Sequence, residues 1–357
     1  MLVRKRQRYT EKLLSSVLGI VGALLCFEVA LRPFVAGWNY PVTPVREIRQ
    51  YTEGMATSHF VPDGIAPYGH RVTGNAFLPD APVGIVLSDS HGLAEAVPDQ
   101  ATASSVIERL SRDEGKPLNV EMYGWTGAAA PTYVATAGEI TDKWHPVWVA
   151  VVLNYTDLTQ EPIYGLGDAW YWQMKIKPDL SIELVDQRPP TPGGRMEAIR
   201  QFLGRSTLAL TLRRRTVLIA GNQQPEPKAA TQASDQKNST VSALKDQIPL
   251  VPRASVRALK QAYGDRLLII YAPECAPFGP LEQTNSEKEL LNACREEGAV
   301  CSSVREAMIS ARDIRGQLYR GFNNTAPCAG HLNEVGQEIV AKEIWRLVAG
   351  SSKGTSH

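Results

Sequence analysis

The stretch "GIVLSDSHGLAEAV", residues 84–97, places a short apolar run directly before a cluster of reactive polar side chains. The apolar run is typical of a buried strand, and a helical pattern follows the cluster. Between them stand Ser88, Asp89, Ser90 and His91. A serine or aspartate at such a turn can simply cap the following helix. The alternative is that the serine is a nucleophile at a strand end. The residues elsewhere in the chain distinguish the helix cap from the nucleophile.

The alternation of strand and helix continues along the chain. Apolar strand patterns cover residues 83–87, 118–124, 146–157 and 266–274. Amphipathic helical patterns cover residues 101–114, 130–144, 253–264, 286–298 and 333–350. Strands that are apolar throughout and separated by helices are typical of a parallel sheet covered on both faces. The sequence therefore predicts a three-layer α/β/α domain with a flavodoxin-like parallel sheet over residues 81–350.

The N-terminus carries the pattern of a membrane anchor. Five basic residues within residues 4–12 precede an uncharged run over residues 13–27. A spanning helix needs about 20 largely apolar residues, and basic residues favour the cytoplasmic side. We expect a cytoplasmic tail over residues 1–12, a transmembrane helix over residues 13–32 and an exported domain. A cleaved signal peptide is the alternative, but Glu28 and Arg32 stand where a small-residue cleavage site is required.

Two further regions depart from the regular alternation. Residues 33–80 show no clear period, and we expect an irregular connector packed on the domain. Residues 164–252 read as an insertion, with a hairpin around a Pro-Asp turn and a polar segment over residues 222–243 that we expect to be disordered. Residues 351–357 form a short tail.

Charge and cysteine usage narrow the function classes. The chain has 38 basic and 37 acidic residues, so its net charge of +1 gives no basis for nucleic-acid binding. Four cysteines, which suggest up to two disulfides in an exported domain, stand in the C-terminal third. Cys294 and Cys301 flank a short segment and could pair locally, which would leave Cys275 with Cys328. A zinc site is the alternative, but close C-x-x-C spacing is absent.

Chemistry-bearing residues follow each predicted strand. Ligands of parallel α/β sheets bind at the carboxyl ends of the strands. Those ends carry Ser90, Gly127 in "YGWTGA", Asn154 in "NYTD" and Glu274, while His331 precedes the last helix in "GHLNEVG". A serine, a glycine N–H, an amide or hydroxyl donor and a histidine are the parts of an ester-cleaving site.

In the order and placement of these blocks the chain resembles the SGNH/GDSL hydrolases. The resemblance covers residues 84–158 and 266–348. It implies that Ser90 is the nucleophile and His331 the general base. It also implies that the N–H groups of Ser90 and Gly127 form an oxyanion hole with a donor from the third block, either Thr156 or Asn154. Each residue also has a plainer interpretation: Ser90 as a helix cap, Gly127 as a turn glycine and His331 as a loop histidine.

The chain departs from the family pattern at the acid. The family has an aspartate three residues before its catalytic histidine, and Cys328 occupies that position here. Glu274 or Asp157 could supply an orienting carboxylate instead, although Asp157 fits a structural role better. A disulfide between Cys275 and Cys328 would fix the histidine loop to a strand end. His91 is interpreted as pocket lining or surface, because a residue adjacent to a nucleophile usually points elsewhere.

Together with the anchor, the resemblance to membrane-anchored bacterial members implies a single-pass protein of the bacterial inner membrane with its domain in the periplasm. We expect it to act on O-acyl groups, most simply O-acetyl groups, of an exported glycan, as an esterase or an acetyltransferase, alongside partners in polysaccharide export or modification. The resemblance implies no metal and no organic cofactor. The alternative is a catalytically degenerate domain that binds glycan or an assembly partner.

Overall fold

Five parallel strands form the centre of the sheet in the computed structural model of the chain. They occur in the order β5 (Asn119–Gly124), β4 (Val83–Ser88), β6 (Trp148–Leu153), β9 (Leu267–Tyr271) and β10 (Val300–Ser303). Numbered along the chain, this order is 2-1-3-4-5, the order of flavodoxin-like sheets. The prediction of a parallel α/β sheet is confirmed.

The structure describes residues 49–53, 56–66, 69–159, 172–186, 250–276, 280–322 and 330–351, together with residues 19, 22, 23, 26 and 328. The chain divides into two compact units, and nearly all described residues belong to the larger one, Val42–Pro189 and Asp235–His357. The predicted anchor over residues 13–32 lies outside the described residues except at four positions. Among the residues described, no helix has the length and apolar character needed to cross a bilayer.

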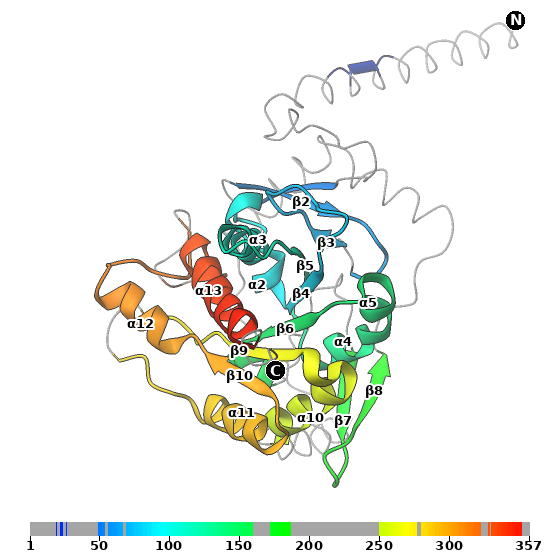
Figure 1. Cartoon of the computed structure of the whole chain (residues 1–357), viewed down its shortest axis with the longest axis vertical. Coiled ribbons are helices and arrows are strands. Elements are labelled where there is room, and N and C mark those ends of the chain that lie inside the picture. Colours follow the sequence, from blue (N-terminus) through cyan, green and yellow to red (C-terminus); the bar gives the residue numbers. More distant parts are fainter. Residues whose placement is uncertain are drawn as a thin grey trace, which may run out of the picture. The chain divides into compact units, whose positions relative to one another are not determined.

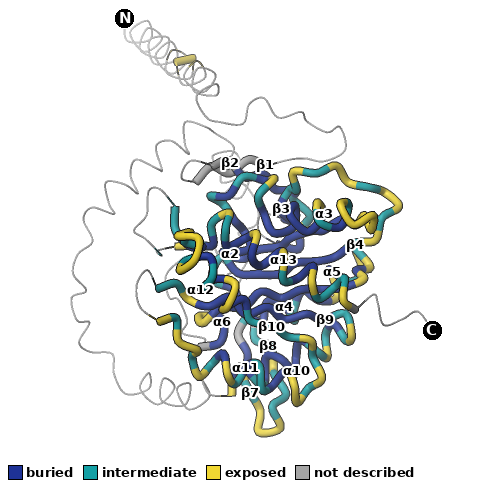
Figure 2. Tube along the Cα trace, turned by 60° about the vertical axis from the view of Figure 1, so that its left-hand side comes forward, coloured by how far each residue is buried: buried dark blue, intermediate teal, exposed yellow. Residues whose placement is uncertain are grey.

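Helices cover both faces of the sheet (Figure 1). One face packs against α3 (Ala103–Asp113), α12 (Arg305–Asp313) and α13 (Glu334–Ser351). The other face packs against α4 (Ala130–Ala135), α5 (Ala137–Trp144), α10 (Val251–Tyr263) and α11 (Asn285–Glu296). The strands β5, β6 and β9 are buried at every position, and the dark blue tubes in the middle of the domain in Figure 2 show this burial. Burial on both faces explains why these strands read as continuous apolar runs.

The region predicted as an irregular connector instead adds three antiparallel strands. They are β1 (Arg49–Glu53), β2 (Ala56–Val61) and β3 (His70–Arg71), and β3 pairs with β5. The prediction failed because β2 and β3 bury the polar side chains of His59, His70 and Arg71, which give no alternating apolar pattern.

The structure differs from the predicted elements at three further places: β10 (Val300–Ser303) and α12 (Arg305–Asp313) were not predicted, and the helix predicted over residues 130–144 is divided. The edge strand β10 and helix α12 lack a continuous apolar signal, and the sequence "VCSS" of β10 is partly exposed. The predicted helix over residues 130–144 is divided at Thr136, whose hydroxyl donates to the carbonyl oxygen of Thr132 at 2.9 Å. Such local bonds compete with regular helix geometry. Single turns α2 (Ser90–Leu93), η2 (Asp99–Ala101), α6 (Tyr155–Thr159) and η4 (Gly264–Arg266) complete the domain.

Within the predicted insertion, the hairpin falls among the described residues. β7 (Trp172–Ile176) and β8 (Ile182–Asp186) pair in antiparallel register, as the Pro-Asp turn predicted. The segment over residues 222–243 and the tail over residues 352–357 lie outside the described residues.

Candidate active site

Ser90 is the first residue of the short helix α2, and Asp89 alone separates it from the end of β4. Asp89 caps this helix, because its carboxylate accepts the backbone N–H of His91 at 2.8 Å. β4 is the first strand of the flavodoxin-like order and lies between β5 and β6. Its carboxyl end is therefore at the topological switch point, where ligands of such sheets bind.

Two glycines let α2 lie directly on the sheet. A Cβ added at Gly124, the last residue of β5, would overlap the backbone of Leu93 in α2. A Cβ at Gly92 would come within 2.6 Å of the Ser88 Cβ. The turn that carries Ser90 is thus closely packed on both strands. The role of Gly124 was missed in the sequence, although a glycine at a strand end does signal a close backbone approach.

Gly127 lies in the tight turn after β5. The N–H of Ala128 donates to the carbonyl oxygen of Trp125 at 3.1 Å, and Gly127 has a φ of +67° at the third position of that turn. A type II turn requires this left-handed conformation, which glycine adopts without strain. The two interpretations of Gly127, as a turn glycine and as an oxyanion donor, are therefore compatible, since the turn fixes the position of the Gly127 N–H.

Asn154 and Thr156 stand after β6, and they differ in what their side chains can donate. The Thr156 hydroxyl donates to Asn154 Oδ1 at 2.5 Å. Asn154 Nδ2 donates to Asp89 Oδ2 at 2.8 Å. An amide nitrogen carries two hydrogens, and the described residues accept only one of them. Of the two side chains predicted as oxyanion donors, Asn154 is therefore the one with a second hydrogen for a further bond, whereas the Thr156 hydroxyl donates to Asn154 itself.

Asp157 is buried beneath this loop. Its Oδ2 accepts the backbone N–H of Asn154 at 2.7 Å. Burial, and then the nearby charge of Asp89, raise the pKa of Asp157 well above its ordinary value. Asp157 therefore orders the loop around Asn154, which is the structural role that the sequence favoured for it.

His331 reaches Ser90 across the site. Its Nε2 lies 2.8 Å from Ser90 Oγ, although the two residues are 241 positions apart in sequence. Both side chains are partly exposed. A neutral imidazole at this distance can accept the hydroxyl proton.

A short antiparallel bridge holds the backbone around His331. Arg320 and Leu332 form the bridge, the N–H of Gly321 donates to the His331 carbonyl at 3.0 Å, and that of Asn333 donates to the Tyr319 carbonyl at 3.2 Å. The Asn333 side chain then caps α13 by accepting two backbone N–H groups at 3.0 and 3.2 Å. The loop that carries His331 is thus fastened on both sides of this residue.

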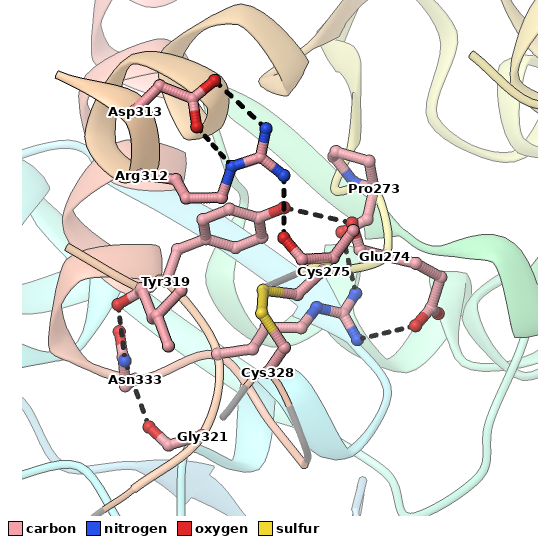
Figure 3. The surroundings of a disulfide bond; sticks show 12 residues. Pro273, Glu274, Cys275, Arg312, Asp313, Tyr319, Gly321, Cys328 and Asn333 are labelled. Carbon is pink, nitrogen blue, oxygen red and sulfur yellow. Dashed lines mark hydrogen bonds and ion pairs between the residues drawn. A yellow bond between two sulfur atoms is a disulfide. The ribbon is translucent and has the colours of Figure 1, made fainter. Parts of the chain in front are cut away.

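The disulfide Cys275–Cys328 ties this loop to the chain that leaves β9 (Figure 3). The second disulfide joins Cys294 in α11 to Cys301 in β10. The pairing left open by the sequence is the one observed, and a four-cysteine zinc site is wrong because all four sulfurs are held in these two disulfides. Among the described residues, no cluster of histidine, cysteine and acidic side chains is suited to a metal ion.

No carboxylate among the described residues hydrogen-bonds to His331. The Glu274 carboxylate, half exposed, lies 3.6 Å from Arg320 Nη1 and forms an ion pair with it (Figure 3). At Cys328, where the resemblance described above predicts an aspartate, the chain has a disulfide bond instead of a negative charge.

His91 is buried, so it does not lie on the surface, which was one of the two interpretations of this residue. Its Nδ1 accepts the backbone N–H of Leu332 at 3.0 Å, and its carbonyl oxygen accepts the Gln337 side-chain amide at 2.9 Å. Its ring lies edge-on to that of His331, with centroids 5.1 Å apart. Burial, outweighing the charge of Asp89, lowers the pKa of His91 to about 3. No local signal announces these contacts, because their partners lie at the other end of the sequence.

The strands of the supposed connector support the segment after α2. Arg71 on β3 forms a buried ion pair with Asp99 and donates to the carbonyl oxygen of Val97 at 2.5 Å. His59 Nδ1 on β2 lies 2.5 Å from the same Asp99 carboxylate. Burial alone would raise the pKa of Asp99, but the bond to His59 and the charge of Arg71 outweigh it, so that pKa is lowered.

Comparison with protein-family models and with curated proteins finds no match. Similar solved structures include the acetyl xylan esterase AlAXEase, at 10% identity over 74% of this chain and 99% of that chain, with a TM-score of 0.38. A lipase/acylhydrolase from Enterococcus faecalis is similar at 12% identity over 76% of this chain and 96% of that chain, with a TM-score of 0.37. "Clostridium thermocellum family 3 carbohydrate esterase" is similar at 10% identity over 76% of this chain and 100% of that chain, with a TM-score of 0.34. At these values the similarity assigns no activity, and the chemistry has to be judged from the residues of the site itself.

Proposed function

We propose that the chain is an SGNH-like serine hydrolase or acyltransferase in which Ser90 and His331 form a catalytic dyad. The observation that carries this proposal is the 2.8 Å distance between His331 Nε2 and Ser90 Oγ. It occurs at the strand end where ligands of flavodoxin-like sheets bind. A capped helix turn and a braced loop hold the two residues, and both side chains remain partly exposed to a substrate.

In the proposed reaction, Ser90 Oγ attacks the acyl carbonyl carbon while His331 Nε2 takes the hydroxyl proton. The tetrahedral intermediate carries its negative charge on the former carbonyl oxygen. That oxygen would accept the N–H groups of Ser90 and Gly127 and the second amide hydrogen of Asn154. Collapse breaks the bond to the sugar oxygen, which receives the proton from His331 and leaves an acyl-serine.

The second half of the reaction decides between the two activities. If water attacks the acyl-serine, His331 takes a proton from it and the acid is released, which makes the protein an esterase. If a sugar hydroxyl attacks in the same way, the acyl group is transferred to a new ester. Both routes need the same residues, so the choice depends on which acceptor reaches the acyl-serine.

We further propose that the substrate is an O-acyl, in particular O-acetyl, glycan outside the cytoplasm. The uncharged run over residues 13–27 behind five basic residues supports an inner-membrane anchor with the domain in the periplasm. The two disulfides support the same placement, since such bonds persist in oxidising compartments. Partners in polysaccharide export or modification would supply the glycan.

The full chain in detergent tests this proposal with p-nitrophenyl acetate, butyrate and octanoate, and with an acetylated and a deacetylated polysaccharide. We expect acetate to be the preferred acyl group, and free acetate or a newly acetylated sugar as the product. The variant Ser90→Ala should lose this activity while unfolding at the wild-type temperature. Preference for octanoate would favour a lipase or thioesterase, and equal activity of Ser90→Ala would exclude the proposed nucleophile.

A second candidate function is that of a binding domain without chemistry. It is favoured by one observation: no carboxylate of the described residues hydrogen-bonds to His331. In that case the wild type and Ser90→Ala would bind the acetylated polysaccharide equally well, and neither would release or transfer acetate. Turnover by the wild type alone excludes this second candidate.

A further inference from the structure

We propose that His91 is a positioning residue that holds the loop of His331 in place for the reaction at Ser90. This inference rests on the proposed function. No carboxylate in the described part of the chain bonds to His331, so we expect this base to be oriented by its own backbone and by its neighbours. His91 contacts the backbone that follows His331 and the ring of His331 itself, although in sequence it is the neighbour of Ser90.

Three contacts of His91 converge on the segment that carries His331. Its Nδ1 accepts the N–H of Leu332, the residue after the base, at 3.0 Å. Its carbonyl oxygen accepts the Gln337 amide at 2.9 Å, and the oxygen of that amide accepts the N–H of Ala103 at 3.0 Å. Its ring packs edge-on against the His331 ring, with an interplanar angle of 74°. His91 therefore connects the Ser90 helix directly to the base and to the start of α13.

The bond to Leu332 fixes the form of His91 that can act in this way. Both ring nitrogens of His91 face a donor, since the Leu332 N–H lies 3.0 Å from Nδ1 and Arg320 Nη1 lies 3.3 Å from Nε2. A neutral ring has one acceptor nitrogen, and the shorter contact assigns that role to Nδ1. A charged ring would place an N–H at Nδ1, facing the N–H of Leu332, and would break the contact.

The surroundings of His91 favour this neutral ring. The side chain is buried, and the guanidinium of Arg320 lies 3.3 Å from its Nε2. Burial is the main cause that lowers the pKa of His91. The carboxylate of Asp89 raises this pKa, whereas the charges of Arg320 and His331 lower it further. The resulting pKa of about 3 keeps His91 neutral throughout the range in which an enzyme of this kind would work.

Two substitutions separate this role from ordinary packing. His91→Asn places an oxygen acceptor near the position of Nδ1. His91→Phe keeps a ring against His331 but removes the acceptor. We expect His91→Phe to lower kcat for acetate release about 10- to 100-fold with KM changed less than about twofold, because a displaced base slows chemistry more than binding. His91→Asn should retain about a third or more of the wild-type kcat.

The same substitutions in a His331→Ala background decide whether His91 acts through the base. If it does, His91→Phe should change the residual rate of Ser90 labelling by a fluorophosphonate less than about twofold in that background. If His91→Phe slows the labelling of Ser90 as much in the His331→Ala background as in the wild-type background, the inference is overturned. A wild-type kcat for His91→Phe would also overturn it. Thermal unfolding of each variant identifies a general loss of fold.

Amide hydrogen exchange at Leu332 separates failure of this inference from failure of the proposed function. Wild type and His331→Ala that label at equal rates would remove the proposed dyad. His91 would still be tested, because its loss should speed exchange of the Leu332 amide about tenfold or more, with His91→Asn remaining near wild type. Unchanged protection of Leu332 in His91→Phe would overturn the positioning role.

Discussion

The two halves of the candidate dyad are held by different means. Ser90 stands on a turn between a buried strand and a capped helix, and two glycines let that helix lie against the sheet. His331 stands on a loop outside the sheet, where a short backbone bridge, a disulfide and a bond to His91 hold it. The nucleophile is positioned by the core of the fold, whereas the base is positioned by a few separate ties.

From this difference we expect substitutions near Ser90 and substitutions in the His331 loop to affect activity and folding differently. Contacts around Ser90 are made by main-chain packing that the whole sheet maintains. Each tie of the His331 loop can be removed alone, without opening the hydrophobic core. We therefore expect substitutions in the loop to lower activity while the fold is kept, and substitutions around Ser90 to test the oxyanion hole.

The largest effect is expected on the nucleophile side, at Asn154. Asn154→Ala removes the proposed third oxyanion donor and should lower kcat for acetate release about 10²- to 10³-fold with KM nearly unchanged. Steady-state kinetics on p-nitrophenyl acetate measures both constants. Thr156→Val is the matched control, because its hydroxyl bonds to Asn154 itself, and we expect a loss of less than about fivefold for it. Equal losses for both variants would contradict the assignment of Asn154.

Removal of the disulfide at the base should have the next largest effect. Cys275→Ser with Cys328→Ser frees the His331 loop, and we expect activity to fall about 10- to 100-fold because the base becomes mobile. The bond spans 53 residues of sequence, so its loss should also lower the free energy of unfolding by up to about 4 kcal/mol. Enzyme assays and urea denaturation measure the two effects.

The second disulfide supplies the matched control for that experiment. Cys294→Ser with Cys301→Ser opens a bond that spans 7 residues of sequence between α11 and β10. We expect a smaller loss of stability, up to about 2 kcal/mol, and nearly unchanged activity. Equal losses of activity for the two pairs would mean that the first disulfide has no special relation to His331.

Restoring an acid should recover part of the loss on the base side. Cys328 has a φ of +63°, a left-handed conformation that aspartate tolerates better than most residues. In the Cys275→Ser background, Cys328→Asp should be about five- to tenfold more active than Cys328→Ser, since a carboxylate can again orient the imidazole. Equal activity of the two proteins would show that the carboxylate does not reach His331.

The smallest effect is a dependence of stability on pH through Asp99. The pKa of this carboxyl is lowered in the folded protein, so its contribution is present above the unfolded pKa and is lost as the pH falls through the folded value. The difference in unfolding free energy between wild type and Asp99→Asn should therefore be largest near pH 6 and shrink as the pH falls below 4. Urea denaturation across this range measures it, and a difference independent of pH would contradict the ion pair.

Local patterns predicted the parallel strands, most of their helices and the hairpin, because burial on both faces gives long apolar runs. The same patterns singled out Ser90 and His331 as residues at strand and helix ends, where the topology brings them together. The strands β2 and β3 escaped prediction because they bury His59, His70 and Arg71, which pair with residues elsewhere in the chain. His91 escaped it for the same reason: its partner Leu332 lies 241 positions away.

Labelling of the full chain by a fluorophosphonate, followed by peptide mapping, tests the proposed dyad most directly. We expect the wild type to be labelled at Ser90, Ser90→Ala to remain unlabelled, and His331→Ala to react about 10²- to 10⁴-fold more slowly, the usual contribution of a positioned base. Folding of all three proteins is checked by thermal unfolding. A folded wild type that is not labelled, or a His331→Ala variant that reacts as fast as the wild type, would contradict the assignment of Ser90 and His331 as a working pair.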